Sequence, residues 1–324
     1  YSKLEDIIGR TELLEQTDGT SVRHGKMNLE KLIYKVESKS TPYCSTKNNE
    51  PFDDAQLSKQ ILKEALPFIK AKKRKTLSYE IKNYNRSVGA SLSGEIAKLY
   101  GNYGLKNSPI TLRLNGTAGQ SLGAWNADGL HIRLTGDAND YVGKGMAGGE
   151  ISISTPEKLA ENADKMVIIG NTCLYGATGG QLFANGIAGE RFAVRNSGCT
   201  SVVEGTGHHA CEYMTGGTIV VLGETGSNFG AGMTGGLAFI YNKGKQFEKN
   251  ANTQSIDYNT LNKKSLNKHK EYLRLLLEKH LKLTNSLKCK RILDNFDTEA
   301  KNFIIVKPIS SNFDELLSQI TSAA

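Results

Sequence analysis

Proline, tryptophan and paired cysteines are scarce in this sequence. It holds 6 prolines, 1 tryptophan and 5 cysteines in 324 residues, and no two cysteines form a C-x-x-C motif. An odd number of widely spaced cysteines argues against a disulfide framework or a zinc ribbon and is typical of a reducing compartment. A run of about 18 apolar residues, which a membrane-spanning helix needs, is also missing. We therefore expect a cytoplasmic protein without a membrane partner, and leave a plastid or another organelle open.

An apolar leader and a nucleic-acid-binding pattern are absent too. The chain begins at Tyr1 without a signal segment, so we expect a fragment of a longer polypeptide. The formal net charge is +8, and lysines within 70–75 and 243–290 carry most of it. Arginine and aromatic residues do not alternate with these lysines, as they do on nucleic-acid-binding surfaces. The charge therefore predicts solvated lysines and no nucleic-acid partner.

The first region, residues 1–107, predicts a connecting segment of mixed helices and loops. EDIIGRTELLEQ indicates a short helical piece over 5–16, and the polar stretch 37–54 indicates a loop. A helix is expected over 55–72, where apolar residues recur on one face, with Asp53 or Asp54 as its cap. A second short helix is expected in SGEIAKLYG, ending near Gly101.

The last region, residues 242–324, predicts a C-terminal helical extension. The stretch 262–284 is strongly amphipathic, with leucines along one face. Helical character continues over 289–296, FIIVKP at 303–308 indicates a short strand, and the tail indicates a further turn or two of helix. The long amphipathic helix can dock a partner, but we expect it to cover the open end of its own domain.

The middle region, residues 108–241, contains short strand-like runs and no convincing helix. Gly, Asn or Asp punctuates almost every run. The phrase GKGMAGGEISIS at 143–154 returns as GAGMTGGLAFIY at 230–241, and runs recur about 20 residues apart, as from Leu130 to Glu150. One strand and turn per period is the pattern of a solenoid, whose coils stack to share a core. The sequence therefore predicts an all-β core in the form of a parallel β-helix.

Glycine motifs of this region match the dinucleotide-binding pattern G-x-G-x-x-G twice, at 143–148 and 230–235. That pattern needs a following helix, whose N-terminus holds the pyrophosphate, whereas β-branched strands follow here. A Walker A loop fails because Gly145 follows Lys144. Corners of stacked coils need positive φ and leave no room for Cβ, so we assign the glycines to turns. They are Gly143, Gly145, Gly148, Gly149, Gly179, Gly180, Gly216, Gly217, Gly230, Gly232, Gly235 and Gly236.

Other constellations give no catalytic, cofactor-binding or metal-binding residue. HHACE at 208–212 has four side chains that can bind a metal, but adjacent histidines of a strand point to opposite faces. TGDANDY at 135–141 lacks the spacing of a calcium loop and indicates a coil corner. Arg191 and Arg195 suit an interface with another domain as well as they suit solvent.

Long motifs, in order, resemble one family. NGTAGQSLGAWN, GNTCLYGATGGQLFANGIAGERFAVRNSG and NFGAGMTGGLAFIY in the middle region are similar to the GXGXG domain that closes the large subunit of glutamate synthase. IIGRTELL and YCSTKNNEPFD before them, and HKEYLRLLLEKH and FIIVKP after them, resemble the flanking segments of that family. The resemblance covers nearly the whole chain.

The resemblance implies a right-handed β-helix without catalytic residues, packed against the amidotransferase and synthase domains of the same polypeptide. The family converts glutamine, 2-oxoglutarate and reductant into two glutamates. It uses FMN and an iron–sulfur cluster in the full-length subunit, and its electrons come from ferredoxin or from an NAD(P)H-oxidising small subunit. Its catalytic parts do not carry over, since Tyr1 stands where an N-terminal cysteine is required and the cysteines lack the cluster spacing.

We therefore expect a scaffold that holds catalytic domains in place and is inactive alone. The alternative is an independent β-helix protein. A carbohydrate-active enzyme would need two carboxylates facing one groove, which a sequence cannot show. A solenoid related to the one in a formylmethanofuran dehydrogenase subunit is the other form of that alternative.

Overall fold

The computed structural model describes residues 1–17, 19, 24–35, 37, 54–101 and 104–322. The chain divides into two compact units, Tyr1–Asp54 and Ala55–Ala324. Most of the loop expected over 37–54 lies outside the described residues, and Asp53 and Cys44 lie there with it.

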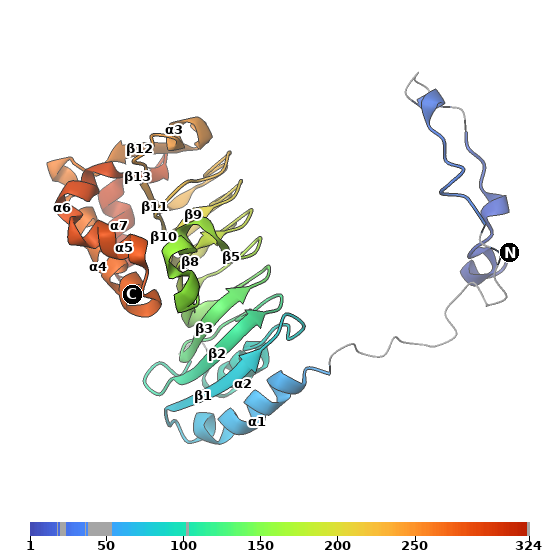
Figure 1. The fold of residues 1–324 in the computed structure, drawn as a ribbon, viewed down its shortest axis with the longest axis horizontal. Helices are drawn as coiled ribbons and strands as arrows, with labels where there is room; N and C mark the ends of the chain where they lie inside the picture. Colours follow the sequence, from blue (N-terminus) through green and yellow to red (C-terminus); the bar gives the residue numbers. More distant parts are fainter. Residues whose placement is uncertain (18, 20–23, 36, 38–53, 102–103, 323–324) are drawn as a thin grey trace. The chain divides into compact units, whose positions relative to one another are not determined.

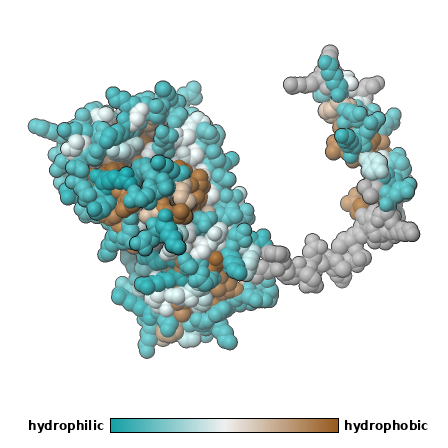
Figure 2. All heavy atoms as spheres, viewed as in Figure 1, coloured by the Kyte–Doolittle hydropathy of each residue, from teal (hydrophilic) through white to brown (hydrophobic). Residues whose placement is uncertain are grey.

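The first unit has little regular structure. Its elements are the short 3-10 helices η1 (Leu4–Ile7), η2 (Thr11–Leu13) and η3 (His24–Lys26). None of them buries a residue. Apolar side chains such as Leu32 and Tyr34 are 79% and 71% exposed, and hydrophobic atoms (brown) lie on the surface of this unit in Figure 2. Among its described residues the unit therefore has no hydrophobic core.

A helix, a strand and a second helix open the second unit (Figure 1). The two helices α1 (Gln56–Lys70) and α2 (Ala90–Tyr100) are the ones expected from the sequence, and Gly101 ends α2 with a φ of 59°. The N-cap of α1 is Ala55, in a left-handed conformation, so the expected aspartate cap was wrong. The strand between the helices, β1 (Lys75–Ile81), was not expected from the sequence.

Parallel strands, stacked one coil on the next, form the expected solenoid. The main face follows the order β1, β2 (Ile110–Ala118), β3 (Leu130–Ala138), β4 (Ala147–Ser154), β6 (Gly179–Ala184), β8 (Ser197–Val203), β10 (Thr215–Val221) and β11 (Gly235–Tyr241). His131 pairs with Glu150 and Thr218 with Leu237, 19 residues apart in both cases. The parallel β-helix and its period of about 20 residues are confirmed.

A second, shorter face follows the main face around the coils. Its strands β5 (Val167–Ile169), β7 (Ile187–Ala188) and β9 (Gly205–Thr206) pair in parallel, starting from the end of β3. One coil is longer than the others because a 3-10 helix, η5 (Glu157–Lys165), is inserted after β4. The step from Glu150 to its partner Gln181 is therefore 31 residues. The expectation of no helix in the middle region was wrong at this insertion.

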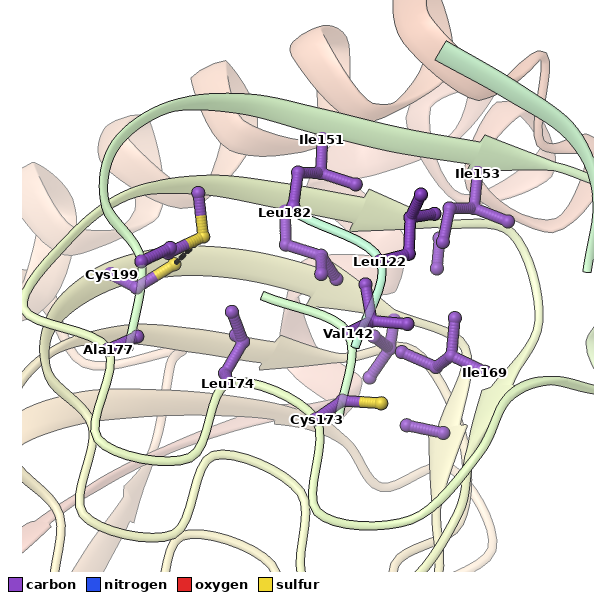
Figure 3. Packing of buried hydrophobic residues seen from close by; sticks show 14 of the residues in the cluster. Leu122, Val142, Ile151, Ile153, Ile169, Cys173, Leu174, Ala177, Leu182 and Cys199 are labelled. Atoms are coloured by element: carbon purple, nitrogen blue, oxygen red, sulfur yellow. Dashed lines mark hydrogen bonds between the residues drawn. The ribbon is translucent and has the colours of Figure 1, made fainter. Parts of the chain in front are cut away.

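Apolar side chains from successive coils fill the interior of the solenoid. Figure 3 shows Ile151, Leu182 and Leu174 directed into this space, with Cys173 and Cys199 beside them. All five are completely buried. Because each coil supplies only part of this core, the coils depend on their neighbours for stability.

The C-terminal region adds two antiparallel strands and a layer of helices. The strand expected from FIIVKP is β13 (Phe303–Pro308), which runs antiparallel to β11 and to β12 (Ile256–Thr260). The helical elements are α3 (Phe247–Asn250), η6 (Lys264–Leu266), α4 (Asn267–Thr284), α5 (Leu287–Asp294), α6 (Phe296–Glu299), η7 (Ala300–Asn302) and α7 (Phe313–Ser322). Of these, α4, α5 and α7 were expected, whereas α3 and β12 were not.

The long amphipathic helix α4 covers the side of the sheet and not the open end of the solenoid. It packs on β4, β6 and β8, while α7 packs on β10 and β11, and Figure 1 shows the helices along the main face. Leu273 and Leu277 of α4 share a second buried cluster with Phe183 and Val202 of the strands. The expected end-capping role was wrong because β13 and β12 already follow the last coil.

The boundaries expected at residues 107 and 241 do not divide the second unit. The sheet includes β1 before the first boundary and β12 and β13 after the second. Strand pairing across both positions joins the three expected regions, apart from the first 54 residues, into one body.

Candidate functional site

Each coil turns one corner with the same alternating backbone. Every second residue of the corner has a positive φ, between 52° and 73°. The amides bond between coils, as from Gly143 to the Leu122 carbonyl (2.9 Å) and from Gly145 to the Tyr175 carbonyl (2.8 Å). The sets of three left-handed residues are Ser121/Gly123/Trp125, Tyr141/Gly143/Gly145, Thr172/Leu174/Gly176, Arg191/Ala193/Arg195, His209/Cys211/Tyr213 and Asn228/Gly230/Gly232. The alternate spacing of glycines in the sequence is therefore the spacing of left-handed positions.

The amides of these corners do not form an anion-binding loop. A phosphate cradle needs several free N–H groups directed at one point. Besides the two bonds above, Gly230 donates to the Ala210 carbonyl (2.9 Å) and Gly232 to Ser255 Oγ (2.9 Å). Both G-x-G-x-x-G matches thus have their amides engaged within the fold, and neither offers a dinucleotide the donors it needs.

The glycine pairs at the start of the strands divide into two kinds. The second glycine of each pair has a positive φ: Gly149 (70°), Gly180 (80°), Gly217 (81°) and Gly236 (82°). The first has an ordinary φ but no room for a side chain. A Cβ on Gly216 would lie 2.2 Å from the Ser197 carbonyl oxygen, and one on Gly235 would lie 2.1 Å from that of Thr215. Their assignment to turns instead of ligand binding remains a prediction, to which this geometry adds a test by substitution.

Sequence reasoning missed the left-handed positions that are not glycine. In the coils at 172–176, 191–195 and 209–213 these positions hold Thr, Leu, Arg, Ala, His, Cys and Tyr. An L residue in this conformation is strained by roughly 1–2 kcal/mol, and the stacked coils hold it there. The signal that could have found these positions is the 19-residue interval itself, counted from Gly230 or Gly232.

The histidines of the 208–212 run lie at such a corner and point to separate partners. His208 Nδ1 accepts from the Ser227 backbone amide (2.8 Å), and His209 Nδ1 lies 2.8 Å from Glu212 Oε1. Cys211 is fully buried inside the coil. Within the described part of the chain no group of three or more metal-ligating side chains comes together. The geometry therefore gives the run a role in connecting neighbouring coils.

The carboxylates of TGDANDY likewise bond to adjacent coils. Asp137 Oδ1 accepts from Thr117 Oγ1 (2.8 Å), and Asp140 Oδ1 accepts from the Asn171 amide (2.8 Å). Asp140 and Asp137 thus serve different coils and do not converge on one ion. The expectation of a coil corner, with side chains capping backbone amides, is consistent with these bonds.

The cysteines of the second unit are unsuited to nucleophilic or redox chemistry. Cys173, Cys199, Cys211 and Cys289 are free and buried. Burial raises the pKa of the Cys173 thiol to about 12 and raises the pKa of the other three thiols as well. Reactive cysteines have the opposite environment, with access to solvent and a lowered pKa.

A charged group joins the helical layer to the sheet. Glu150 of β4 bonds to Arg133 of β3 and to Lys279 of α4, whose Nζ lies 2.5 Å from Glu150 Oε2. Burial acts to raise the pKa of Glu150, but the hydrogen bond from Lys279 and the charge of Arg133 outweigh it and hold the pKa below its usual range. These contacts satisfy the carboxylate within the fold, so the group is structural.

A second buried polar group lies where α4 and α5 meet the coils. Glu204 accepts a hydrogen bond from Ser286 Oγ, and His280 Nε2 lies 3.6 Å from Glu204 Oε1. Asn185 donates to the carbonyl of Thr284 at the end of α4 (3.2 Å). All of these side chains are buried. The bonds fix the turn between the two helices on the sheet and leave no access for a substrate.

A pocket of about 190 Å³ lies where β10 and β11 end. Leu222, Ile240 and Phe247 supply apolar walls, and Lys288 also lines it. The Lys288 ammonium is 3.6 Å from Asp164 Oδ2, so its charge already has a partner. No pair of acid and base or nucleophile and base faces this space in the part of the chain that the structure describes.

Comparison with known proteins decides the family. The model of the GXGXG motif family matches residues 54–309. The chain belongs to the GXGXG family. Its match begins one residue before the second unit and includes α1, β1 and the C-terminal strands. The GXGXG family thus extends beyond the 108–241 segment that the glycine motifs mark.

The GXGXG chain is also similar to curated glutamate synthases. It is 46% identical over 318 residues to a ferredoxin-dependent glutamate synthase of Pyropia yezoensis, covering 97% of this chain and 20% of that protein. It is 46% identical over 304 residues to ferredoxin-dependent glutamate synthase 2 of Synechocystis sp., covering 91% and 19%. The NADPH glutamate synthase large chain of Bacillus subtilis is 39% identical over 323 residues, covering 99% and 21%. The chain spans about a fifth of the length of these relatives.

Two further observations complete the description of this GXGXG protein. Arg191 and Arg195 both lie exposed at a coil corner, so their role at an interface remains a prediction. Among the described residues no helix has the length and apolar character needed to cross a membrane.

Proposed function

We propose that this chain is the structural GXGXG domain of a glutamate synthase and carries no reaction itself. The observation that supports it best is the match over 97% of the chain to a glutamate synthase of which the chain forms only 20%. A solenoid whose glycine amides, carboxylates and cysteines are engaged in its own fold suits a supporting role. The catalytic work then belongs to the remaining four fifths of the polypeptide.

The proposed reaction of the whole protein is the conversion of glutamine, 2-oxoglutarate and reductant into two glutamates. FMN and an iron–sulfur cluster would be held by the remainder of the polypeptide. Electrons would come from ferredoxin or from an NAD(P)H-oxidising small subunit. The relatives named for ferredoxin and the one named for NADPH differ only from 46% to 39% in identity to this chain, so this domain does not select between donors. A cytoplasmic or plastid location suits its unpaired cysteines.

The test uses this chain and the remainder of its polypeptide as two separate proteins. The chain alone is expected to show no flavin absorbance, no glutaminase activity and no glutamate formation. The remainder alone is expected to hydrolyse glutamine with little coupled glutamate formation, and adding the chain is expected to restore coupling. Turnover by the lone chain, or full coupling without it, would contradict the proposal.

A further inference from the structure

A row of residues along one edge of the solenoid has no role in the contacts described so far. It consists of the third left-handed residue of each corner, named here the edge row: Trp125, Gly145, Gly176, Arg195, Tyr213 and Gly232. The Trp125 amide donates to the Lys144 carbonyl (2.8 Å) and the Arg195 amide to that of Glu212 (2.9 Å), so the positions stack coil on coil. At about 4.8 Å per coil, Trp125 and Tyr213 lie about 19 Å apart.

The side chains of the edge row have polar groups without partners. Trp125 is 62% exposed and Tyr213 is 58% exposed, and Arg195 is exposed between them. Within the described part of the chain, the indole N–H, the phenol O–H and the guanidinium make no hydrogen bond or ion pair. Trp and Tyr usually combine an apolar contact with a bonded polar tip, so both halves of these side chains are available to a partner.

Both rings are held in place before any partner arrives. A Cβ on Gly145 would lie 2.9 Å from Cδ1 of the Trp125 ring, and a Cβ on Gly232 would lie 2.6 Å from Cδ1 of the Tyr213 ring. Each ring therefore packs against the backbone of the glycine one coil further on. A side chain that is already ordered loses little conformational entropy on binding.

Folding alone does not account for these residues. A left-handed conformation costs a non-glycine residue roughly 1–2 kcal/mol, and an exposed ring recovers little of this by burial. Gly145, Gly176 and Gly232 occupy the same row, so the corner accepts glycine there. Trp125 is the only tryptophan of the chain. Trp, Tyr and Arg are the residue types that dominate the binding energy of protein interfaces.

We propose that the edge row is the surface through which this domain docks on the remainder of its own polypeptide. The proposal rests on the proposed function, because the chain forms only 20% of the relative from Pyropia yezoensis and the rest of such a protein lies outside it. The six positions span about 24 Å, a length suited to an interface of about 800 Å² on each partner. The matching surface offers apolar contacts to the two rings and a carboxylate to Arg195.

The experiment measures binding of this chain to the separately expressed remainder of its polypeptide, by calorimetry. The test variant is the triple substitution Trp125→Gly, Arg195→Gly and Tyr213→Gly. Glycine is the residue that other coils carry at this position, so melting temperature is expected to stay the same or rise. Affinity is expected to fall at least a hundredfold. The matched control is Arg191→Gly, an exposed arginine at the first left-handed position of a corner (φ 59°), which is expected to leave affinity unchanged.

The outcomes separate this proposal from the proposed function. Equal affinity of parent and triple variant for the remainder would overturn the edge row and leave the proposed function standing. Failure of the parent to bind the remainder at all would overturn both. Sedimentation of the lone chain supplies a further arm: a dimer of the parent that the triple variant loses would assign the row to a second copy and overturn the proposal. Binding of soluble polysaccharide that depends on the two rings would overturn it as well.

Discussion

The early and late coils of the solenoid differ in what covers their outer face. In β3, Ile132 and Leu134 are buried in the interior while Arg133 between them is partly exposed. In β10, Ile219 lies in the interior cluster and Val220 in the cluster that the C-terminal helices cover. The early strand alternates between apolar and polar residues, and the late strand is continuously apolar because both of its faces are buried.

A solenoid sequence thus marks the position of its second layer. Alternation with period two indicates a strand with one solvated face, and loss of alternation indicates a covering layer. LHIRLTG and TIVVLG differ in this way although both belong to the same sheet. The helices α4 and α7 pack along the late strands, where the alternation disappears.

The largest expected effect breaks a feature that early and late coils share, the glycine pair. Gly217 has a φ of 81°, and a Cβ there would lie 2.4 Å from the Cys199 carbonyl oxygen. Gly217→Val is therefore expected to destabilise by about 4–5 kcal/mol in urea melts. Gly232→Val is expected to cost less, about 1–3 kcal/mol, because its neighbour is the movable Tyr213 ring.

A matched glycine in a helix supplies the control. Gly94 lies inside α2, and a Cβ added there would have no heavy atom within 4 Å outside its own helix backbone and chain neighbours. Gly94→Ala is expected to stabilise by about 0.5–1 kcal/mol, since alanine loses less backbone entropy on folding. Equal melts for Gly217→Val and the parent would return the glycine pairs to the class of ligand-binding loops.

The second effect tests the covering layer of the late coils. Leu273 of α4 is completely buried against the sheet, while Leu275 of the same helix is 63% exposed. Leu273→Ala is expected to lower the free energy of unfolding by about 3 kcal/mol, and Leu275→Ala by less than about 0.5 kcal/mol. Similar values for the two variants would show that α4 contributes little to the stability of the late coils.

The third effect concerns the coil where the covering layer begins. The pKa of Glu150 is held below its usual range, so its contribution to stability is present above the unfolded value of about 4.3 and is lost as pH falls through the folded pKa. Glu150→Gln is expected to cost about 1–2 kcal/mol at pH 7, and this difference should disappear near pH 3. Melts at the two pH values decide it, and a difference independent of pH would mean that charge is not the cause.

The smallest expected effect separates the coils from the first unit. The 3-10 helices described in Tyr1–Asp54 bury no residue, so they add no core to the chain. Removal of residues 1–54 is expected to leave the melting temperature of the remainder within about one degree of the parent. A large drop in calorimetry would show that the first unit packs on the solenoid after all.

The strands and long helices could be predicted because their patterns are local. A stretch such as TIVVLG between glycines is apolar enough to be a buried strand, and the leucines of 262–284 follow one helical face. The strand β1 in KTLSYEI was missed because it alternates weakly and follows a lysine run. The position of α4 on the side of the sheet depends on which surface remains open after β13 pairs, and that is decided by the whole fold.

The candidate site was predictable only where glycine occupies the left-handed position. Gly143 and Gly230 suggest turns by themselves, whereas Leu174 and Cys211 adopt the same backbone without any local signal. Neighbouring coils impose that conformation through their carbonyls, as Val142 does on the Leu174 amide (2.8 Å). Local propensity is overridden there by stacking, and only the 19-residue interval carries the information.

The reversed strand β13 has a consequence for polymerisation. A stack of parallel coils has no natural end, since the last coil is a template on which the first coil of another molecule can continue the ladder. Here β13 pairs antiparallel with β11 and β12 follows it, so the exposed edge has the opposite direction. Asp257 and Lys307, 3.5 Å apart, add charge at this edge. A head-to-tail filament would need a parallel edge at this end, and the protein instead closes as a discrete particle.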